Sequence, residues 1–321
     1  MKGIELAKDN LDEEMKNKIN IIYEDTQSKA NLAVDATNKL INLNNVKLII
    51  GPIRSDNTLA VAPFVEKNKI ILMSPVATSE KISLAGDYIF RNRENGALHS
   101  QKFSEFLIQK NLKEVNLFVA QSSNAQTYAK TFIDSFETLG GKIIIRLDYQ
   151  PAQTDFRTEL TKLVHNKPST IFLAPTTGRD AGLIVKQLRE LKWNGLIICV
   201  SMFPETTDFK NSVQNYEEGI IYSAPKIPVT EQFTHFIKKY KEKYGSTPDF
   251  LSANGYDAFM IFVQAIEQCN QDTNCIKNYL YNLQNYTGVG GITSFDKNGD
   301  VQKEVEIKII KQGQFVKYDL E

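Results

Sequence analysis

The sequence has 321 residues, enough for two domains of ordinary size. Apolar residues make up 42% and charged residues 24%, as in ordinary folded proteins, and 38 basic against 38 acidic side chains leave no net charge. This balance argues against nucleic acid or an anionic membrane surface as partner, because both attract a basic excess. No apolar run reaches the roughly 18 residues that span a bilayer, so no membrane insertion of this chain is expected.

Short apolar, β-branched runs alternate with helical patterns over the first two thirds of the chain. Nearly continuous runs of this kind indicate strands that are buried on both faces. Between them, segments such as 29–43 place Leu32, Ala36 and Leu40 on one helical face. The alternation predicts βαβ units, parallel sheets and the α/β class. The predicted strands are 18–25, 46–52, 69–75, 114–121, 142–149, 170–175 and 195–201.

Later segments interrupt this rhythm. Residues 87–100, "DYIFRNRENGALHS", are interpreted as a segment crossing between two sheets, and 223–231, "SAPKIPVTE", as a second irregular stretch. Two long helices are predicted at 230–244 and 250–268. A turn-rich stretch and a terminal hairpin with its turn at "KQGQ" follow, at 288–301 and 304–320.

The residues that directly follow the predicted strands are the first place to look for a site, because ligands bind beyond the carboxyl ends of parallel strands. These segments are rich in hydroxyl and amide side chains and contain no histidine or cysteine. None combines a nucleophile with a base, and no dinucleotide, nucleotide or hydrolase motif is present. We therefore expect neither an enzyme nor a cofactor, and an α/β enzyme remains only a distant alternative.

Ser55 follows the second predicted strand, at the start of a predicted helix. One interpretation is that Ser55, or Asp56 beside it, only caps that helix. The other is that the helix start is an anion site, since free backbone amides and a hydroxyl favour negative charge there. Thr78 stands in a similar position after the next strand, so Ser55 and Thr78 together could hold one carboxylate.

The histidines and cysteines predict no metal site. His99, His165 and His235 lie in polar helical segments and are expected to face solvent. Cys199 lies inside an apolar run and is predicted to be a core residue. Cys269 and Cys275 are either two unrelated thiols or a short disulfide, and no histidine near them suggests zinc. "FDKNGD" lacks the glutamate of a calcium loop and predicts a turn.

Four stretches in the right order carry a resemblance that covers essentially the whole chain. The sequence is similar to the leucine/isoleucine/valine-binding-protein family, the type I periplasmic solute-binding proteins of ABC importers. The resemblance implies two doubly wound lobes, joined by three hinge crossings, with the ligand bound between them. It places one lobe at 1–96 and 226–304 and the other at 97–225 and 305–321. The stretches are 23–41, 46–80, 254–267 and 288–301.

The resemblance also implies ligand contacts. In the first lobe they are Ser55 and the segment Val76, Ala77 and Thr78, which would grip an amino acid's carboxylate and amine. In the second lobe Asn124 stands where a tyrosine is usual, and Thr177 where some members have tyrosine. Ser201 stands where amino-acid binders often have an acidic residue for the ammonium group. The residues that would bind the carboxylate of an amino acid are therefore kept, while no acidic residue is evident for its ammonium group.

The start of the chain departs from the family. Members begin with a signal sequence, a first strand and a glycine-rich loop, whereas this sequence opens at "GIELAKDNL", where the next helix would begin. We expect the first strand to be absent, through a shortened chain or a misassigned start. The resemblance implies a periplasmic or cell-surface location despite the missing signal sequence, and in such a compartment a disulfide between Cys269 and Cys275.

The function implied is that of a solute-binding protein. It would bind a small carboxylate-bearing solute, an amino acid or a relative, by hinge closure and deliver it to an ABC transporter permease. The alternative is a sensing or receptor module of the same fold, with the same pocket and another partner.

Overall fold

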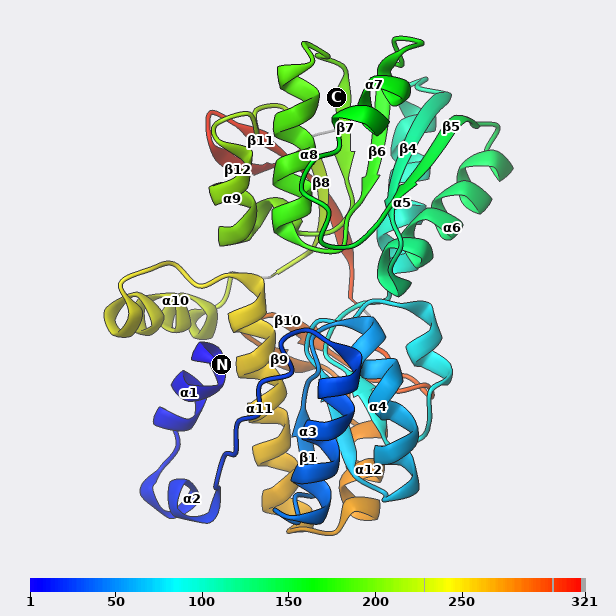
Figure 1. Cartoon of the computed structure of the whole chain (residues 1–321). Helices are drawn as coiled ribbons and strands as arrows, with labels where there is room; N and C mark the ends of the chain where they lie inside the picture. Colours follow the sequence, from blue (N-terminus) through cyan, green and yellow to red (C-terminus); the bar gives the residue numbers. More distant parts are fainter. Residues whose placement is uncertain (228, 302, 319–321) are drawn as a thin grey trace. The chain divides into compact units, whose positions relative to one another are not determined.

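The computed structural model describes residues 1–227, 229–301 and 303–318, and the chain divides into two compact units. Unit 1 comprises Met1–Asn95 and Ile227–Lys303, and unit 2 comprises Gly96–Lys226 and Glu304–Glu321. The chain therefore passes from one unit to the other three times. Both units combine helices with mostly parallel strands, which confirms the α/β class predicted from the sequence (Figure 1).

Unit 1 is built from two parts of the chain. The first part contains α1 Lys2–Asp9, α2 Glu13–Lys18, α3 Ala30–Asn42, β1 Leu48–Ile50, α4 Ser55–Lys67, β2 Ile71–Ser74, the 3₁₀ helix η1 Glu80–Leu84 and β3 Ile89–Arg91. The second part contains α10 Glu231–Tyr244, α11 Phe250–Cys269, α12 Thr273–Tyr281, β9 Tyr286–Gly288 and β10 Gly291–Thr293. The helices predicted at 230–244 and 250–268 are thus confirmed as α10 and α11.

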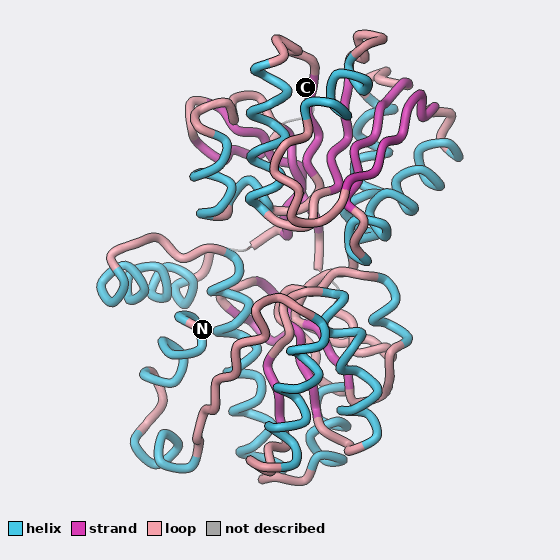
Figure 2. Tube along the Cα trace, viewed as in Figure 1, coloured by secondary structure: helices cyan, strands magenta, loops and turns pink. Residues whose placement is uncertain are grey.

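The sheet of unit 1 has three parallel strands in the order β1-β2-β3, and β9 and β10 form a separate antiparallel pair. Figure 2 draws the strands in magenta. Successive side chains of a strand point to opposite faces. Ile71 and Met73 accordingly pack against α11 and α12, whereas Leu72 packs with α3 and α4. The continuous apolar run of β2 is therefore explained by helices on both faces.

The strand predicted at 18–25 is not present. These residues run extended but pair with no strand, and among the described residues β1 pairs only with β2. A cavity of about 430 Å³ lies between them, lined by residues 18–24, residues 44–50 and α11. The apolar side chains of the segment are held by this lining and by α1, α10 and α11 instead of by a strand ladder.

The segment 87–100 is not only a crossing, because it begins with the strand β3. Arg91 is fully buried in β3, where its Nε lies 2.6 Å from Asp300 Oδ1 and its Nη1 donates to the Ser79 carbonyl at 2.8 Å. Polar and charged residues follow directly after Ile89 and Phe90, so the apolar run is too short to predict a strand from the sequence. The charge of Arg91 is balanced by Asp300, 209 residues later in the chain, whereas Arg93 pairs with the adjacent Glu94.

Unit 2 holds a seven-stranded sheet in the order β12-β11-β8-β7-β6-β4-β5. Strands β4 to β8 run parallel, and β11 and β12 form the predicted terminal hairpin, antiparallel to β8 and to each other. The strand order reverses at β4. The elements are α5 Gly96–Gln109, β4 Glu114–Ala120, α6 Ser123–Thr138, β5 Lys142–Tyr149, α7 Arg157–Val164, β6 Thr170–Ala174, α8 Gly178–Glu190, β7 Leu196–Cys199, η2 Phe203–Glu205, α9 Thr207–Val213, β8 Ile221–Pro225, β11 Val305–Lys311 and β12 Gln314–Lys317.

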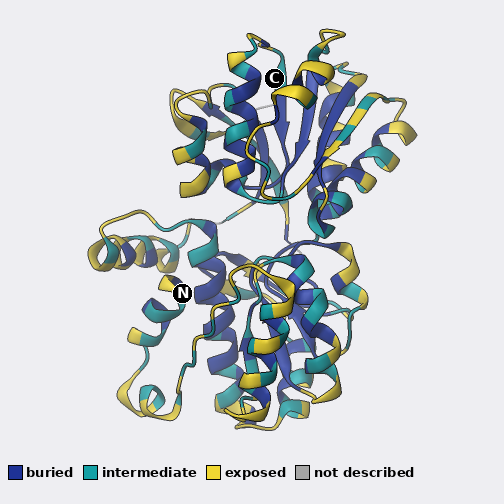
Figure 3. Cartoon of the chain, viewed as in Figure 1, coloured by how far each residue is buried: buried dark blue, intermediate teal, exposed yellow. Residues whose placement is uncertain are grey.

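The central strands of unit 2 are almost completely buried (Figure 3). Helices cover them, α5 packing with α6 and α8 packing with α7 and α9. Their nearly continuous apolar sequences follow from this burial on both faces. Residues 319 and 320 of the predicted hairpin lie outside the described residues. None of the helices in the described part of the chain is long and apolar enough to cross a membrane.

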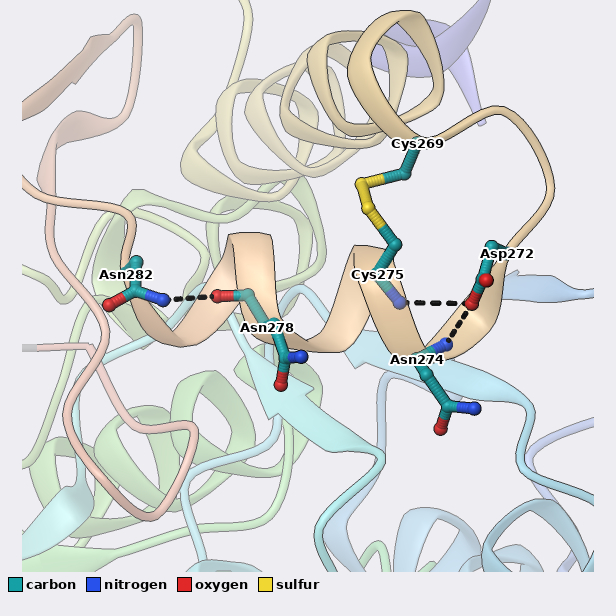
Figure 4. The surroundings of a disulfide bond; sticks show 6 residues. All are labelled: Cys269, Asp272, Asn274, Cys275, Asn278 and Asn282. Atoms are coloured by element: carbon teal, nitrogen blue, oxygen red, sulfur yellow. Dashed lines mark hydrogen bonds between the residues drawn. A yellow bond between two sulfur atoms is a disulfide. The ribbon is translucent and has the colours of Figure 1, made fainter.

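A disulfide joins Cys269, the last residue of α11, to Cys275 in the first turn of α12 (Figure 4). The two Cα atoms are 5.5 Å apart. Asp272 caps α12 between them, its Oδ1 accepting from the amides of Asn274 at 2.9 Å and Cys275 at 3.0 Å. The cap and the disulfide together fix the turn between the two helices. Cys199 is the free cysteine and is completely buried in β7.

The turn between β9 and β10 is held by a buried carboxylate. Asp257 of α11 accepts from the amides of Val289 at 2.8 Å and Gly290 at 2.7 Å, and Lys303 Nζ donates to the Gly290 carbonyl at 3.2 Å. A side chain at Gly288 would collide with the carboxylate, since its Cβ would lie 2.3 Å from Asp257 Oδ2. Burial raises the pKa of Asp257 to about 6, against the opposing effect of Lys303 and the two amides.

We expect the denatured, non-reduced protein from an oxidising compartment to react with a thiol reagent at one cysteine, Cys199. Cys269→Ser should lower the free energy of unfolding by about 2 kcal/mol, because a cross-link over so short a loop restricts the unfolded chain modestly. Thiol counting and urea unfolding measure the two effects. Three reactive thiols before reduction would contradict the disulfide.

We expect the stability that Asp257 contributes to decrease as the pH rises. Its folded pKa of about 6 lies above the ordinary 3.8, so folding favours the protonated carboxyl. The contribution is complete below about pH 4 and is lost as the pH rises through 6, a change of about 3 kcal/mol. Asp257→Asn, which is neutral throughout, should remove this slope from urea unfolding curves recorded between pH 4 and 7.

Asp134→Asn, at an exposed position on α6, is the matched control for this measurement. It should leave the pH dependence of the wild-type protein almost unchanged. Parallel stability curves for the wild type and Asp257→Asn would show that the carboxyl of Asp257 titrates normally in the folded state.

Candidate functional site

The loops that follow β1 and β2 in unit 1 are tied together by side-chain oxygens. The Pro52 carbonyl, just after β1, accepts from Ser74 Oγ at the end of β2 at 2.6 Å and from Thr58 Oγ1 of α4 at 3.2 Å. Ser74 Oγ also accepts from the amide of Ala77 at 3.2 Å. Gly51 has a φ of 116°, which glycine adopts without strain, and its amide bonds to the Met73 carbonyl. The two strand ends therefore form one preorganised edge.

Ser55 does not cap α4, contrary to the first interpretation of the sequence. The helix begins at Ser55 itself, and Arg54 is the N-cap residue without a side-chain hydrogen bond to the helix. Ser55 Oγ instead accepts from the amides of Thr78 at 3.2 Å and Ser79 at 3.1 Å on the neighbouring loop. The oxygen thus satisfies two amides of another strand end, and the first amides of α4 receive no side-chain cap from Arg54.

The arrangement leaves specific donors available in unit 1. A serine hydroxyl has one donor and two acceptor positions, and Ser55 uses both acceptor positions for the two amides. Among the described residues its proton has no acceptor, nor does the hydroxyl of Thr78, and both residues are about 4% exposed. Together with the start of α4, this edge can donate hydrogen bonds to an anion.

The other predicted residues of this loop have supporting positions. Val76 is partly exposed, while Ala77 is buried and engages Ser74 through its amide. Asn254 of α11 donates to the Pro75 carbonyl at 3.0 Å. Ser74 could have been found from its position at a strand end. Asn254 could not, because it comes from a helix almost two hundred residues later and carries no local signal.

In unit 2, Asn124 lies at the point where the strand order reverses. Such switch points are where open α/β sheets bind ligands. Ser122 after β4 lies 2.7 Å from Thr176 Oγ1 after β6, and it donates to Asn124 Oδ1 at 2.8 Å. The Nδ2 group of Asn124 has no acceptor among the described residues, and the residue is partly exposed at the start of α6. It is therefore an available donor.

The hydroxyl of Thr177 makes all its hydrogen bonds within the fold, at the start of α8. Thr177 is the N-cap of α8 in a capping box, with its Oγ1 accepting from the amide of Asp180 and donating to the Asp180 carboxylate. Asp180 also accepts from the amides of Thr176 and Thr177 and from the Tyr149 hydroxyl at 2.6 Å. Burial and this carboxylate raise the pKa of Tyr149 far above its usual value, so the tyrosine remains a donor. Thr177 retains no proton for a ligand.

Ser201 lies at the end of β7, buried and in the left-handed backbone region with a φ of 62°. Its amide donates to Ser223 Oγ of β8 at 3.1 Å. The structure thus places Ser55 next to Thr78 in unit 1, and Asn124 and Thr177 beside the linked loops after β4 and β6 in unit 2. Ser201 belongs to a separate strand end of unit 2.

His99 does not face solvent, contrary to the prediction, although His165 and His235 are exposed as predicted. Its side chain is fully buried because α5 packs against β8 and β11. Its Nδ1 lies 2.8 Å from Ser223 Oγ, and its ring meets Tyr128 edge to face at 6.1 Å between centroids. A polar helix sequence gave no signal for this burial. Within the described residues no cluster of three histidine, cysteine or acidic side chains could hold a metal ion.

Comparisons with known proteins concern the family and the fold. The sequence model of a family described as periplasmic binding proteins matches residues 2–313. The structure of LivK, a leucine binding protein from Thermotoga maritima, superposes with a TM-score of 0.92 at 26% identity, covering 99% of this chain and 92% of that chain. A solute binding protein of an ABC transporter from R. palustris, solved with benzoate, has a TM-score of 0.88 over 98% of this chain and 89% of that chain. Its identity is 15%, so this likeness concerns the fold.

A curated relative is an uncharacterised protein of Methanocaldococcus jannaschii. It is 20% identical over 262 residues, which are 76% of this chain and 61% of that protein. This chain therefore spans about three fifths of the length of that relative.

Proposed function

The chain belongs to the family of periplasmic binding proteins, and we propose that it binds a small carboxylate-bearing solute, an amino acid or a related acid, for an ABC importer. The family is one of binding proteins rather than of enzymes. An extracytoplasmic place, in the periplasm or at the cell surface, and a permease as partner follow from the proposal. LivK binds leucine and the R. palustris protein was solved with benzoate, and both ligands carry a carboxylate.

The observation that carries the proposal is the pairing of Ser55 with the loop after β2. Because its oxygen holds the amides of Thr78 and Ser79, its proton has a fixed direction and remains available. The start of α4 adds the positive end of a helix dipole and its first amides. Hydrogen bonds from such donors to a carboxylate are charge-assisted and stabilise a complex by roughly 1.5–3 kcal/mol each.

Unit 2 supplies the remaining contacts in this proposal. Asn124 offers an amide donor at the switch point of the sheet, and Ser201, just after β7, is the second residue of unit 2 that we propose to lie at the ligand. Thr176 of unit 2 and Ala77 of unit 1 bond to neighbouring loop residues, and in this proposal they support the loops. A ligand that takes contacts from both units favours the state in which both hold it at once, and a permease can recognise that state.

The proposal favours the carboxylate over the amine as the recognised group. Asp180, the acidic residue beside Thr177, already accepts from Tyr149, from the Thr177 hydroxyl and from two amides. An ammonium group would have to displace one of these donors. We therefore expect the amine of an amino acid to contribute little to affinity, unlike its carboxylate.

This expectation is tested with three compounds that share the side chain of leucine. L-leucine has a carboxylate and an amine, isocaproate has only the carboxylate, and isoamylamine has only the amine. In calorimetric titrations, isocaproate should bind within about tenfold of L-leucine, and isoamylamine should not bind measurably. Benzoate extends the series to an aromatic acid. Binding of isoamylamine but not of isocaproate would refute carboxylate recognition.

The residues are tested by substitution. Ser55→Ala and Thr78→Ala should each weaken the binding of the tightest acid in this series more than tenfold, since each removes a hydrogen bond to a charged group. Ser83→Ala is the matched control, because its hydroxyl in the same unit bonds to Asp300 and Arg91 instead. Unchanged affinity in the first two variants, with a lowered melting temperature, would assign both hydroxyls to the fold alone.

A further inference from the structure

His99 is a fully buried histidine of unit 2 that contacts the strand β8 close to the end of β7. It lies on α5, and its Nδ1 is 2.8 Å from Ser223 Oγ on β8. The same Ser223 oxygen accepts from the amide of Ser201 at 3.1 Å. A single hydroxyl thus connects the imidazole to the backbone of Ser201, two residues after β7.

The register of the sheet explains why Ser201 needs this partner. The parallel ladder between β7 and β8 pairs Ile198 with Ile221 and Cys199 with Tyr222, and it goes no further. Beyond it the amide of Val200 bonds to the Leu173 carbonyl, and the chain turns out of the sheet at Ser201. At that point the amide of Ser201 takes a side-chain hydroxyl of β8 in place of a backbone carbonyl.

The backbone conformation of Ser201 is a second reason why its hydrogen bond to Ser223 matters. Its φ of 62° is in the left-handed region, which a residue other than glycine occupies only when its surroundings hold it there. While the hydroxyl of Ser223 accepts from this amide, its single proton must point to another acceptor. His99 Nδ1 is positioned to accept that proton.

We propose that His99 is a positioning residue, which acts through Ser223 to hold Ser201 in its left-handed conformation and thereby sets the affinity of unit 2 for ligand. The proposal rests on the function proposed above. In this arrangement Ser223 accepts from Ser201 and donates to Nδ1, which therefore carries no proton. His99 itself need not touch the ligand.

The test has one readout that needs no ligand. Amide hydrogen exchange of Ser201, measured by NMR in the full chain, should accelerate at least tenfold in His99→Leu and in Ser223→Ala, because each removes a member of the chain of hydrogen bonds. His99→Asn, whose side-chain oxygen can accept in place of Nδ1, should restore slow exchange. Ser100→Ala is the matched control, since this buried hydroxyl of α5 bonds to the Tyr128 carbonyl.

The second readout is affinity for isocaproate. It should fall at least fivefold in His99→Leu and Ser223→Ala, and stay within twofold of wild type in His99→Asn and Ser100→Ala. Unchanged exchange of Ser201 in both first variants overturns the proposal, as does faster exchange with unchanged affinity. If the wild-type protein binds neither isocaproate nor L-leucine, the proposed function fails, and that result is separate from the exchange measurement.

Discussion

Backbone groups that leave a parallel sheet lose their ladder partners, and in this protein side-chain oxygens replace those partners at the strand ends. Ser55 holds two amides after β2, Asp180 holds two after β6, and Ser223 holds one after β7. A buried backbone amide without a partner costs roughly 1–3 kcal/mol, so these oxygens are required by the fold. Their positions determine which hydrogen-bonding groups remain for a ligand.

Residues with a hydroxyl group therefore have different roles at different strand ends. Ser55 accepts twice and keeps a proton, whereas the Thr177 hydroxyl both accepts and donates within its capping box. Both are hydroxyl residues directly after a strand, and a sequence cannot tell them apart. The difference depends on which neighbouring amide lies within reach, and this depends on the tertiary structure. We therefore propose Ser55 and Asn124 as ligand contacts, because each keeps a hydrogen-bond donor that the described part of the fold does not use.

The sequence predicted the parts of the fold that follow from local pattern. Six of the runs interpreted as strands, the helices α10 and α11, and the terminal hairpin are present, because apolar periodicity and turn residues decide them. It failed where distant partners decide the structure. The strand β3 contains Arg91, which is tolerated only because Asp300 neutralises it, and His99 is buried only because α5 packs on β8.

The segment 18–25 was predicted to be a strand, but the structure contains no strand there. Its apolar, β-branched sequence fits a strand, yet a strand also needs a neighbour within hydrogen-bonding distance. In the structure a cavity separates these residues from β1, so they keep an extended backbone without a ladder. Local propensity could not specify whether the segment pairs with another strand. The residues that a site requires from such distant elements, Asn254 in unit 1 and Ser223 in unit 2, were missed for the same reason.

The acidic residues bear on the ligand charge that we propose, because the fold already uses their oxygens as acceptors. A balanced composition of 38 basic and 38 acidic side chains favours neither cation nor anion. Near the strand ends of unit 2, however, Asp180 is saturated by its own donors, and Glu205 accepts from Tyr222 at 2.7 Å and Lys308 at 3.0 Å. The donors of Ser55, Thr78 and Asn124 are not saturated in this way. In the function we propose, a carboxylate can engage these donors without breaking a hydrogen bond of the fold, whereas an ammonium group would have to compete for Asp180 or Glu205 with the donors that they already hold.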